Sequence, residues 1–174
     1  KSTMFLDYLK KFVIKKIVNK ALSSDVVHDN VGKISTVGII ADEMFLTQTE
    51  SLKQRLIENG ICESDIFIII RSAKAIATTD GYVTFNSSTV SSSGSFLNPA
   101  ILQFVETDFD LLINYYEQEK PVALMASALS KAKFKVGFST IDKRVNNLIL
   151  DISPDNYQIF EEELFKYLKI LNRI

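Results

Sequence analysis

The sequence predicts a Rossmann-like α/β fold, in which helices cover both faces of a mainly parallel, twisted sheet of five to six strands with one antiparallel edge strand. Short β-branched runs alternate along the chain with amphipathic or Ala/Leu-rich segments, which is typical of a three-layer α/β/α arrangement. Residues 66–70 are apolar at every position, as expected for a central strand that is covered on both faces. With 174 residues the chain is near the usual size of one domain, so we expect a single domain over residues 1–174.

The composition is that of an ordinary globular protein. Hydrophobic residues make up 47% and charged residues 24% of the chain, and these fractions exclude collagen-like, mucin-like and wholly disordered proteins. The single cysteine, Cys62, rules out an intrachain disulfide. Together with the single histidine, His28, it leaves no Cys/His metal site and no catalytic triad to assemble. We therefore expect no cofactor, and these observations favour a protein that is not an enzyme.

The sequence also predicts a cytoplasmic location and no transmembrane segment. No apolar run approaches the roughly 18 to 20 residues that span a bilayer. A secretory signal places its charges before an apolar core, whereas the early lysines of this chain are scattered among apolar positions. A lone cysteine suits a reducing compartment.

Residues 4–22 predict a basic amphipathic helix, because apolar side chains recur there at helical spacing. The helix carries a single acid, Asp7, against five lysines: Lys10, Lys11, Lys15, Lys16 and Lys20. Its local charge of about +4 could mark an anionic partner, whether a membrane surface, a nucleic acid or an acidic protein. The alternative is a helix that packs on the core and leaves its basic face to solvent.

Strands and helices alternate through the middle of the chain. We expect strands at residues 35–40, 66–70, 82–85 and 110–114, and helices at residues 48–59, 99–105 and 121–129. Thr47 and Glu50 have the spacing of a capping box, and Gly60 suits the end of the helix that they begin. Pro99 and Pro121 fit the first turns of the other two helices. The Ser91–Ser95 segment is interpreted as a flexible loop rather than a ligand lid or an anion nest.

Two more strands are expected at residues 134–138 and 148–152, followed by a last helix that begins at Ser153 and Pro154. The connection between the two strands is shorter than the dozen or so residues that a parallel crossover usually takes, so we expect them to pair antiparallel. Dimerisation through the apolar last helix is a further hypothesis. Right-handed crossovers place the first strand beside the 110–114 strand, where the strand order reverses.

Ligands of open α/β sheets bind outside the carboxyl ends of the strands at such a reversal. The candidate ligand-binding residues share a position at or just beyond a strand end: Asp42, Glu43, Arg71, Asn114, Tyr115, Tyr116 and Ser139. In this interpretation the carboxylates accept hydrogen bonds from ligand hydroxyls, Asn114 makes directional hydrogen bonds and Tyr115 stacks on the ligand. The alternative is that strand ends are polar because loops are wet, and that the tyrosines pack on their neighbours.

Other motifs carry less weight. The two glycine-rich fingerprints of phosphate-binding loops, Gly-x-Gly-x-x-Gly and Gly-x-x-x-x-Gly-Lys-Ser/Thr, do not occur in the sequence. Asp108 and Asp110 match the Asp-x-Asp pair with which many sugar-nucleotide transferases hold a divalent cation. Because these aspartates enter a strand instead of leaving one, we expect a solvated turn at the rim away from the ligand. Asp151 is also expected at that opposite rim, because its strand is expected to run antiparallel.

Several segments carry a resemblance to an uncharacterised bacterial, Bacteroidota-type family over nearly the whole chain: residues 110–116, 135–139, 142–144 and 163–172. No activity, cofactor or catalytic residue comes with that family. Residues 110–138 also resemble a strand-helix-strand piece of the amino-terminal half of heptosyltransferase-type glycosyltransferases. The second, nucleotide-sugar-binding half of those enzymes and their glycine-rich opening loop have no counterpart in this sequence.

Two functions remain open. The first is a non-catalytic binding or adaptor domain, which uses the basic first helix to contact an unknown protein or an anionic surface. The second is a small-molecule-binding domain for a nucleotide or sugar nucleotide, with its site at the expected reversal of strand order.

Overall fold

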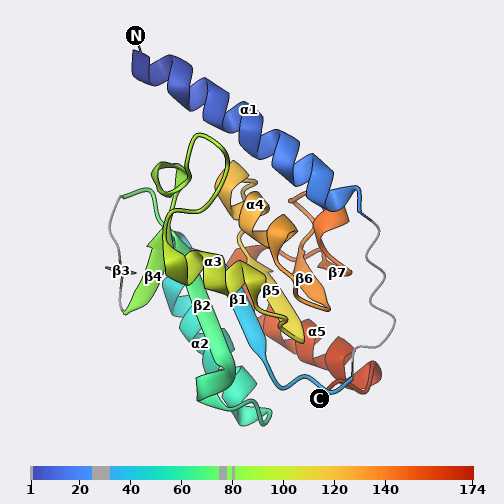
Figure 1. Ribbon diagram of the computed structural model, residues 1–174. Helices are drawn as coiled ribbons and strands as arrows, with labels where there is room; N and C mark the ends of the chain where they lie inside the picture. The colour runs from blue at the N-terminus through green and yellow to red at the C-terminus, as the bar shows by residue number, and fades with distance from the viewer. Residues whose placement is uncertain (1, 25–31, 75–77, 80) are drawn as a thin grey trace.

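A computed structural model describes residues 2–24, 32–74, 78–79 and 81–174, and it has an α/β fold as predicted (Figure 1). One seven-stranded sheet has the order β3-β4-β2-β1-β5-β6-β7. Its strands are β1 (Val37–Asp42), β2 (Ile66–Arg71), β3 (Thr78–Thr79), β4 (Tyr82–Phe85), β5 (Leu111–Tyr115), β6 (Lys135–Phe138) and β7 (Leu148–Leu150). Its helices are α1 (Ser2–Leu22), α2 (Leu46–Glu58), α3 (Pro99–Glu106), α4 (Pro121–Leu129) and α5 (Tyr157–Ile170).

The strand order reverses at β1, as the sequence predicts. β1 pairs in parallel with β2 on one side and with β5 on the other, so that Val37 is in register with both Ile66 and Leu111. After β1 the chain adds β2, β3 and β4 on one side of β1. It then returns and adds β5, β6 and β7 on the other side. Loops at the carboxyl ends of these strands diverge at this point, which is where open α/β sheets bind their ligands.

The predicted antiparallel pairing of residues 134–138 with 148–152 is wrong. β7 runs parallel to β6, with Val136 in register with Leu148. The connection achieves this crossover with one short 3-10 turn, Lys143–Val145, instead of a full helix, and Val145 is buried against the sheet face that carries α4. The described strands pair antiparallel only at the other edge, where β3 contributes two residues beside β4.

Two apolar layers sandwich the sheet. Alternate side chains of the central strands point to opposite faces: Ile39 packs with the helices α2 and α5, whereas Ile40 packs with α1, α3 and α4. Pro99 and Pro121 stand in the first turns of α3 and α4, as predicted. The predicted Thr47 capping box does not form, because a 3-10 turn over Glu43–Phe45 precedes α2 and is capped by the Asp42 carboxylate.

The second half of α1 packs on the body of the protein, chiefly on α4. Ile14 and Val18 are buried there. The Ser91–Ser95 segment lies against this helix and forms a hydrogen-bonded turn, in which the Gly94 N–H donates to the Ser91 carbonyl over 3.1 Å. Gly94 has a φ of +87°, and a Cβ at this position would overlap with Cδ1 of Ile17. The turn and the helix therefore fit together only because residue 94 has no side chain.

The aspartate of the Asp-x-Asp pair that enters β5 is not solvated. Asp110 is only 9% exposed, and its Oδ2 accepts hydrogen bonds from the backbone N–H and hydroxyl groups of both Ser35 and Thr36. Its Oδ1 pairs with Nζ of Lys133 over 2.7 Å. Burial alone would raise the pKa of Asp110, but these hydrogen bonds, led by that from Lys133, lower it well below its ordinary value. The side chain thus ties the start of β1 to β5.

Candidate ligand-binding cavity

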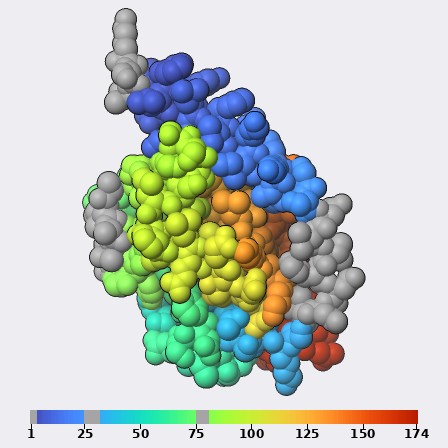
Figure 2. All heavy atoms as spheres, viewed as in Figure 1, coloured from blue at the N-terminus to red at the C-terminus, as the bar shows by residue number. Residues whose placement is uncertain are grey.

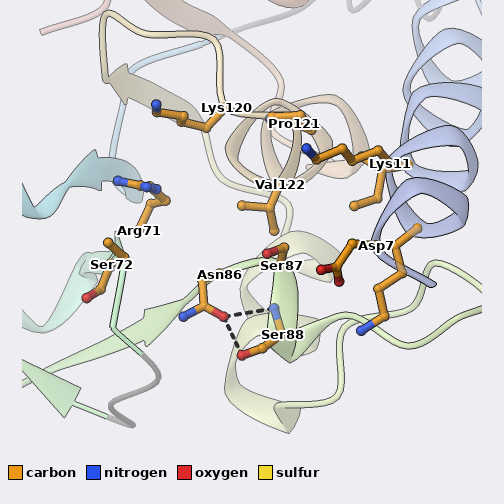
Figure 3. Close-up of a pocket in the computed structure, with 13 residues that line it drawn as sticks. Asp7, Lys11, Arg71, Ser72, Asn86, Ser87, Ser88, Lys120, Pro121 and Val122 are labelled. Carbon is orange, nitrogen blue, oxygen red and sulfur yellow. Dashed lines mark hydrogen bonds between the residues drawn. The ribbon is translucent and has the colours of Figure 1, made fainter. Parts of the chain in front are cut away.

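A cavity of about 530 Å³ opens at the carboxyl edge of the sheet, between α1 and the ends of the strands (Figure 3). Four segments enclose it: one face of α1, residues 71–73 at the end of β2, residues 86–88 after β4, and residues 120–122 at the start of α4. The cavity thus lies beside the reversal of strand order, and the helix that the sequence predicts to be basic forms one of its walls.

The charged residues that line this cavity are mainly cationic. Lys10 and Lys11 come from α1, Arg71 from the end of β2, and Lys120 from the residue before α4, whereas Asp7 is the one acid in the described lining. Figure 3 shows Lys11 on the α1 side of the cavity, with Arg71 and Lys120 across from it. Positive charge from three separate segments therefore gathers around one space.

Uncharged polar side chains also line the cavity. Asn86 caps the 3-10 turn Ser87–Thr89, and its Oδ1 accepts hydrogen bonds from the backbone N–H of Ser88 over 2.9 Å and from the Ser88 hydroxyl over 2.6 Å. Asn86 also donates to the Lys74 carbonyl over 3.0 Å. These bonds hold the turn in place, so that Ser87 and Ser88 line the cavity beside α1.

Asp42, at the end of β1, and Glu43, just after it, position residues 71–73 without lining the cavity. Asp42 accepts a hydrogen bond from Nη1 of Arg71 over 2.9 Å, and both side chains are largely buried. Glu43 accepts from the Ser72 hydroxyl over 2.6 Å and from the Ala73 N–H over 2.8 Å. The hydrogen bond from Ser72, followed by that from Ala73, lowers the pKa of Glu43. Both acids therefore act on the residues that follow β2.

Asn114 and Tyr116, two of the predicted ligand-binding residues, lie in the core instead. Asn114 is fully buried, donating to Asn146 over 2.8 Å and accepting from the Ser127 hydroxyl over 2.6 Å. Tyr116 is also buried, and its hydroxyl is 2.7 Å from that of Ser127. Neither residue lines the cavity.

Tyr115 points to the opposite face of the sheet, where its ring makes edge-on contacts with Phe45, Phe138 and Phe160. It is fully buried, and burial raises its pKa. The structure therefore places Tyr115 as the alternative interpretation has it, packed on its neighbours.

Ser139 and Asp151 lie together at the ends of β6 and β7, where the Ser139 hydroxyl donates to Oδ1 of Asp151 over 2.5 Å. Neither lines the cavity. The prediction that Asp151 lies at the opposite rim is wrong, because β7 runs parallel to β6 and ends at the same edge of the sheet.

The lysines of α1 divide into two groups. Lys10 and Lys11 line the cavity, whereas Lys15, Lys16 and Lys20 are exposed and outside it. The sequence suggests the basic helix and the sheet-edge site as separate hypotheses. The structure joins them, because Lys10 and Lys11 of the basic helix also line the cavity at the sheet edge.

Most of the cavity lining is not predicted by the sequence, and the missed polar residues include Asn86, Ser87, Ser88 and Lys120. Lys120 carries a signal that could have found it, because it directly precedes the proline that begins α4 at the carboxyl end of β5. Asn86 stands at the cap of the 3-10 turn that follows β4.

A second cavity, of about 520 Å³, lies near the amino end of β6, between the last turn of α1 and the end of α4. Lys135 lines it and donates from Nζ to the Ser127 carbonyl over 2.7 Å. Burial lowers the pKa of Lys135 to about 8. Because this amine is already bound to the protein and lies at the amino edge of the sheet, the first cavity is the better candidate for a ligand site.

Metal-binding clusters and membrane-spanning helices are both missing from the described parts of the chain. Within these ranges, no group of three or more His, Cys, Asp and Glu residues is placed to hold a metal ion. Among the described helices, none is both long and apolar enough to cross a bilayer. His28, the single histidine, lies outside the described residues, and Cys62 is exposed.

Comparison with known families adds an assignment. A sequence profile of one family matches residues 10–171 and so covers nearly the whole chain. The chain belongs to the family of unknown function DUF6913. Apart from Asp7, every residue that lines the first cavity falls within the part of the chain that matches DUF6913. No curated protein and no solved structure matches the chain.

Proposed function

We propose that this DUF6913 chain is a non-catalytic binding domain whose cavity under α1 takes a small anionic ligand. One observation carries the proposal: cationic side chains from α1, from the end of β2 and from the start of α4 converge on one cavity at the carboxyl edge of the sheet. Charges of one sign around a partly closed space concentrate ligands of the opposite charge. Phosphate and carboxylate groups are the anions that Lys and Arg side chains bind best.

A nucleotide or sugar nucleotide fits this cavity in size and in chemistry. Its volume of about 530 Å³ is in the usual range for small-molecule sites. Ala73 and Pro121 supply exposed apolar surface for a base or a sugar ring, and the serine hydroxyls can bond to ligand oxygens. Because no glycine-rich loop lets the backbone approach a phosphate, the lysine and arginine side chains would carry the recognition.

The resemblance of residues 110–138 to heptosyltransferase-type enzymes is a prediction from the sequence, and on that prediction the nucleotide class is favoured. The residues that carry it, 110–138, form the strand-helix-strand unit β5-α4-β6, and the start of α4 lines the cavity. That likeness does not supply a catalytic residue, so the proposal remains a binding function. A bacterial origin, a cytoplasmic location and dimerisation through α5 remain predictions from the sequence.

Thermal unfolding with inorganic pyrophosphate and with a nucleoside diphosphate sugar, such as UDP-glucose, tests the proposal. A ligand at about a hundred-fold excess over its Kd is expected to raise the Tm by about 5 to 10 °C. Lys11→Gln and Lys120→Gln should each reduce this shift. Lys15→Gln is the matched control, because Lys15 is exposed on the same helix and outside the cavity.

Two outcomes would contradict the proposal. The first is the absence of any shift across both anions at low salt. The second is a shift that Lys15→Gln reduces as much as Lys11→Gln does, because this would show that the anions collect on the surface of α1 and not in the cavity.

A second candidate function is that of an adaptor that docks on an anionic partner through α1. The observation that favours it is the exposure of Lys15, Lys16 and Lys20, which face solvent outside the cavity. Such an association would weaken with rising salt and on charge reversal of Lys15 and Lys16 to Glu. A pull-down at low salt that is insensitive to these two changes would speak against it.

A further inference from the structure

The first half of α1 carries an apolar stripe that faces solvent. Phe5, Tyr8, Leu9 and Phe12 recur at the spacing that puts side chains on one face of a helix. Their exposed fractions are 64%, 70%, 41% and 62%. Contiguous apolar surface of this kind is rare on soluble proteins outside interaction sites.

This stripe lies on the side of α1 that is turned away from the body. The buried residues of α1, Ile14 and Val18, occupy the opposite side, since Phe12 and Ile14 are about 200° apart around the helix axis at 100° per residue. Figure 1 shows the first turns of α1 extending past α4 and the neighbouring loop, and Figure 2 shows them projecting from the rest of the molecule. The described part of the chain leaves these four side chains uncovered.

Cationic side chains continue the same face along the helix. Lys15 and Lys16 follow Phe12 by three and four residues, and both are exposed, as is Lys20 one turn later. The single acid of the helix, Asp7, lines the cavity. The outward face of α1 is therefore apolar in its first turns and cationic in the next.

We propose that this outward face binds an anionic lipid bilayer, with α1 lying in the interface and the Phe5–Phe12 stripe buried among headgroups and upper acyl chains. On an interfacial helix large apolar side chains enter the bilayer, while lysine stems extend so that their ammonium groups remain at the anionic headgroups. The inference goes beyond the cavity and does not depend on it, because it rests on the opposite side of the helix.

Other occupants fit less well. A second copy of this chain, packed face to face, would bring the lysines of two helices together without any acid on that face to neutralise them. A nucleic acid would pair with the lysines but would leave the phenylalanine, tyrosine and leucine side chains against phosphates. An anionic bilayer satisfies both halves of the face at once.

A fluorescence experiment on the full chain tests the proposal, since the sequence contains no tryptophan. The Phe12→Trp variant is mixed with vesicles of phosphatidylcholine alone, or of phosphatidylcholine with about 30% phosphatidylglycerol to give an anionic surface. We expect a blue shift of the tryptophan emission and quenching by brominated acyl chains only with the anionic vesicles. Partitioning should fall as the salt concentration rises.

Matched variants separate insertion from simple charge attraction. With sedimentation as the readout, Phe5→Ser and Phe12→Ser together should weaken partitioning by about ten-fold or more. The double change of Lys15 and Lys16 to Gln should weaken it on anionic vesicles as well. Ile170→Ser is the control, because Ile170 is 64% exposed and lies on α5, which covers the other face of the sheet. Circular dichroism and the Tm confirm that each variant is folded.

Three outcomes would overturn the proposal. The first is no partitioning on anionic vesicles. The second is partitioning that the lysine changes abolish but the phenylalanine changes leave intact. The third is a dimer mass in solution that Phe5→Ser and Phe12→Ser convert to a monomer. The cavity is tested apart from this, because Lys120→Gln should leave vesicle binding unchanged.

Discussion

Arg71 and Asp42 form an ion pair, with Nη1 and Oδ2 separated by 2.9 Å, that joins the carboxyl ends of β2 and β1. Arg71 lines the proposed anion cavity, whereas Asp42 lies behind it and beside Lys120 in a smaller hollow. The carboxylate therefore offsets part of the positive charge that the cavity presents. It also fixes the direction of the guanidinium group.

Replacing Asp42 by Asn should strengthen anion binding in the cavity. The change removes a negative charge next to Arg71 and Lys120, so we expect the Kd for pyrophosphate to fall several-fold at low salt. The same change breaks a largely buried ion pair and should lower the free energy of unfolding by about 2 kcal/mol. Isothermal titration with pyrophosphate, alongside urea unfolding, measures both effects.

Asp151→Asn is the control for this prediction, because Asp151 is exposed at the same edge of the sheet but bonds to Ser139 and does not line the cavity. If Asp42→Asn weakened the binding of pyrophosphate, the carboxylate would have to contribute directly to the ligand site, and the assignment of Arg71 as the anion-binding partner would need revision.

Replacing Asn114 by Ala should destabilise the fold and leave ligand binding intact. The change removes a fully buried amide that bonds to both Ser127 and Asn146, so that two polar side chains lose a partner in the core. We expect the free energy of unfolding to fall by about 1 to 3 kcal/mol. The increase in Tm caused by pyrophosphate should match that of the unchanged protein. Loss of the ligand effect in a folded variant would place Asn114 in the binding site.

The buried position of Asn114 shows why the site could be predicted only in part. Alternation of strands and helices was sufficient to place β1 beside β5 and to locate Arg71 near a strand end at the ligand edge. β5, however, continues to Tyr115, and Asn114, expected at an open strand end, lies inside the sheet, where it accepts a hydrogen bond from Ser127 of α4. The length of a strand depends on the layers that pack on it, and a single sequence carries little information about that.

Connection length is a weak guide to strand direction at the other side of the sheet. A short link usually joins antiparallel strands, but one 3-10 turn with Val145 buried is enough to return the chain for a parallel strand.

The cavity itself depends on α1, and the sequence does not indicate on which side of the sheet that helix packs. Lys10 and Lys11 are therefore predicted as partner-binding residues and not as cavity residues.

Replacing Gly94 by Ala should loosen the packing of α1. A methyl group at this position would overlap with Cδ1 of Ile17, and the φ of +87° is strained for any side chain. We expect a loss of about 2 kcal/mol in the free energy of unfolding and faster hydrogen exchange in α1. Adding Ile17→Ala should recover part of the loss.

Gly81→Ala separates the two effects in this prediction. Gly81 has a φ of +83°, but a methyl group added there would have no described atom within 4 Å, so its substitution reports the backbone strain alone. If Gly94→Ala cost no more than Gly81→Ala and left the exchange of α1 unchanged, α1 would not pack on the 91–95 turn as the structure has it.

Asp110 should make the stability of the protein depend on pH in the acid range. Against the opposing effect of burial, hydrogen bonds from Lys133, Ser35 and Thr36 hold its pKa in the folded state well below the ordinary value of 3.8, whereas the unfolded chain keeps the ordinary value. A carboxyl group whose pKa is lowered by folding contributes stability above its unfolded pKa, and this contribution is lost as the pH falls toward the folded value. The loss should therefore begin below about pH 4.

Asp110→Asn tests this directly. The amide cannot carry the charge that pairs with Lys133, so we expect the variant to be about 2 kcal/mol less stable than the unchanged protein at pH 7. The difference should shrink between about pH 4 and about pH 2.5, on the order of 1.4 kcal/mol for each pH unit, because the unchanged protein loses its advantage there. Urea unfolding across this range provides the measurement, and Asp108→Asn, an exposed acid two residues earlier, provides the control. A difference that stays constant with pH would mean that Asp110 stabilises the fold through packing and not through its charge.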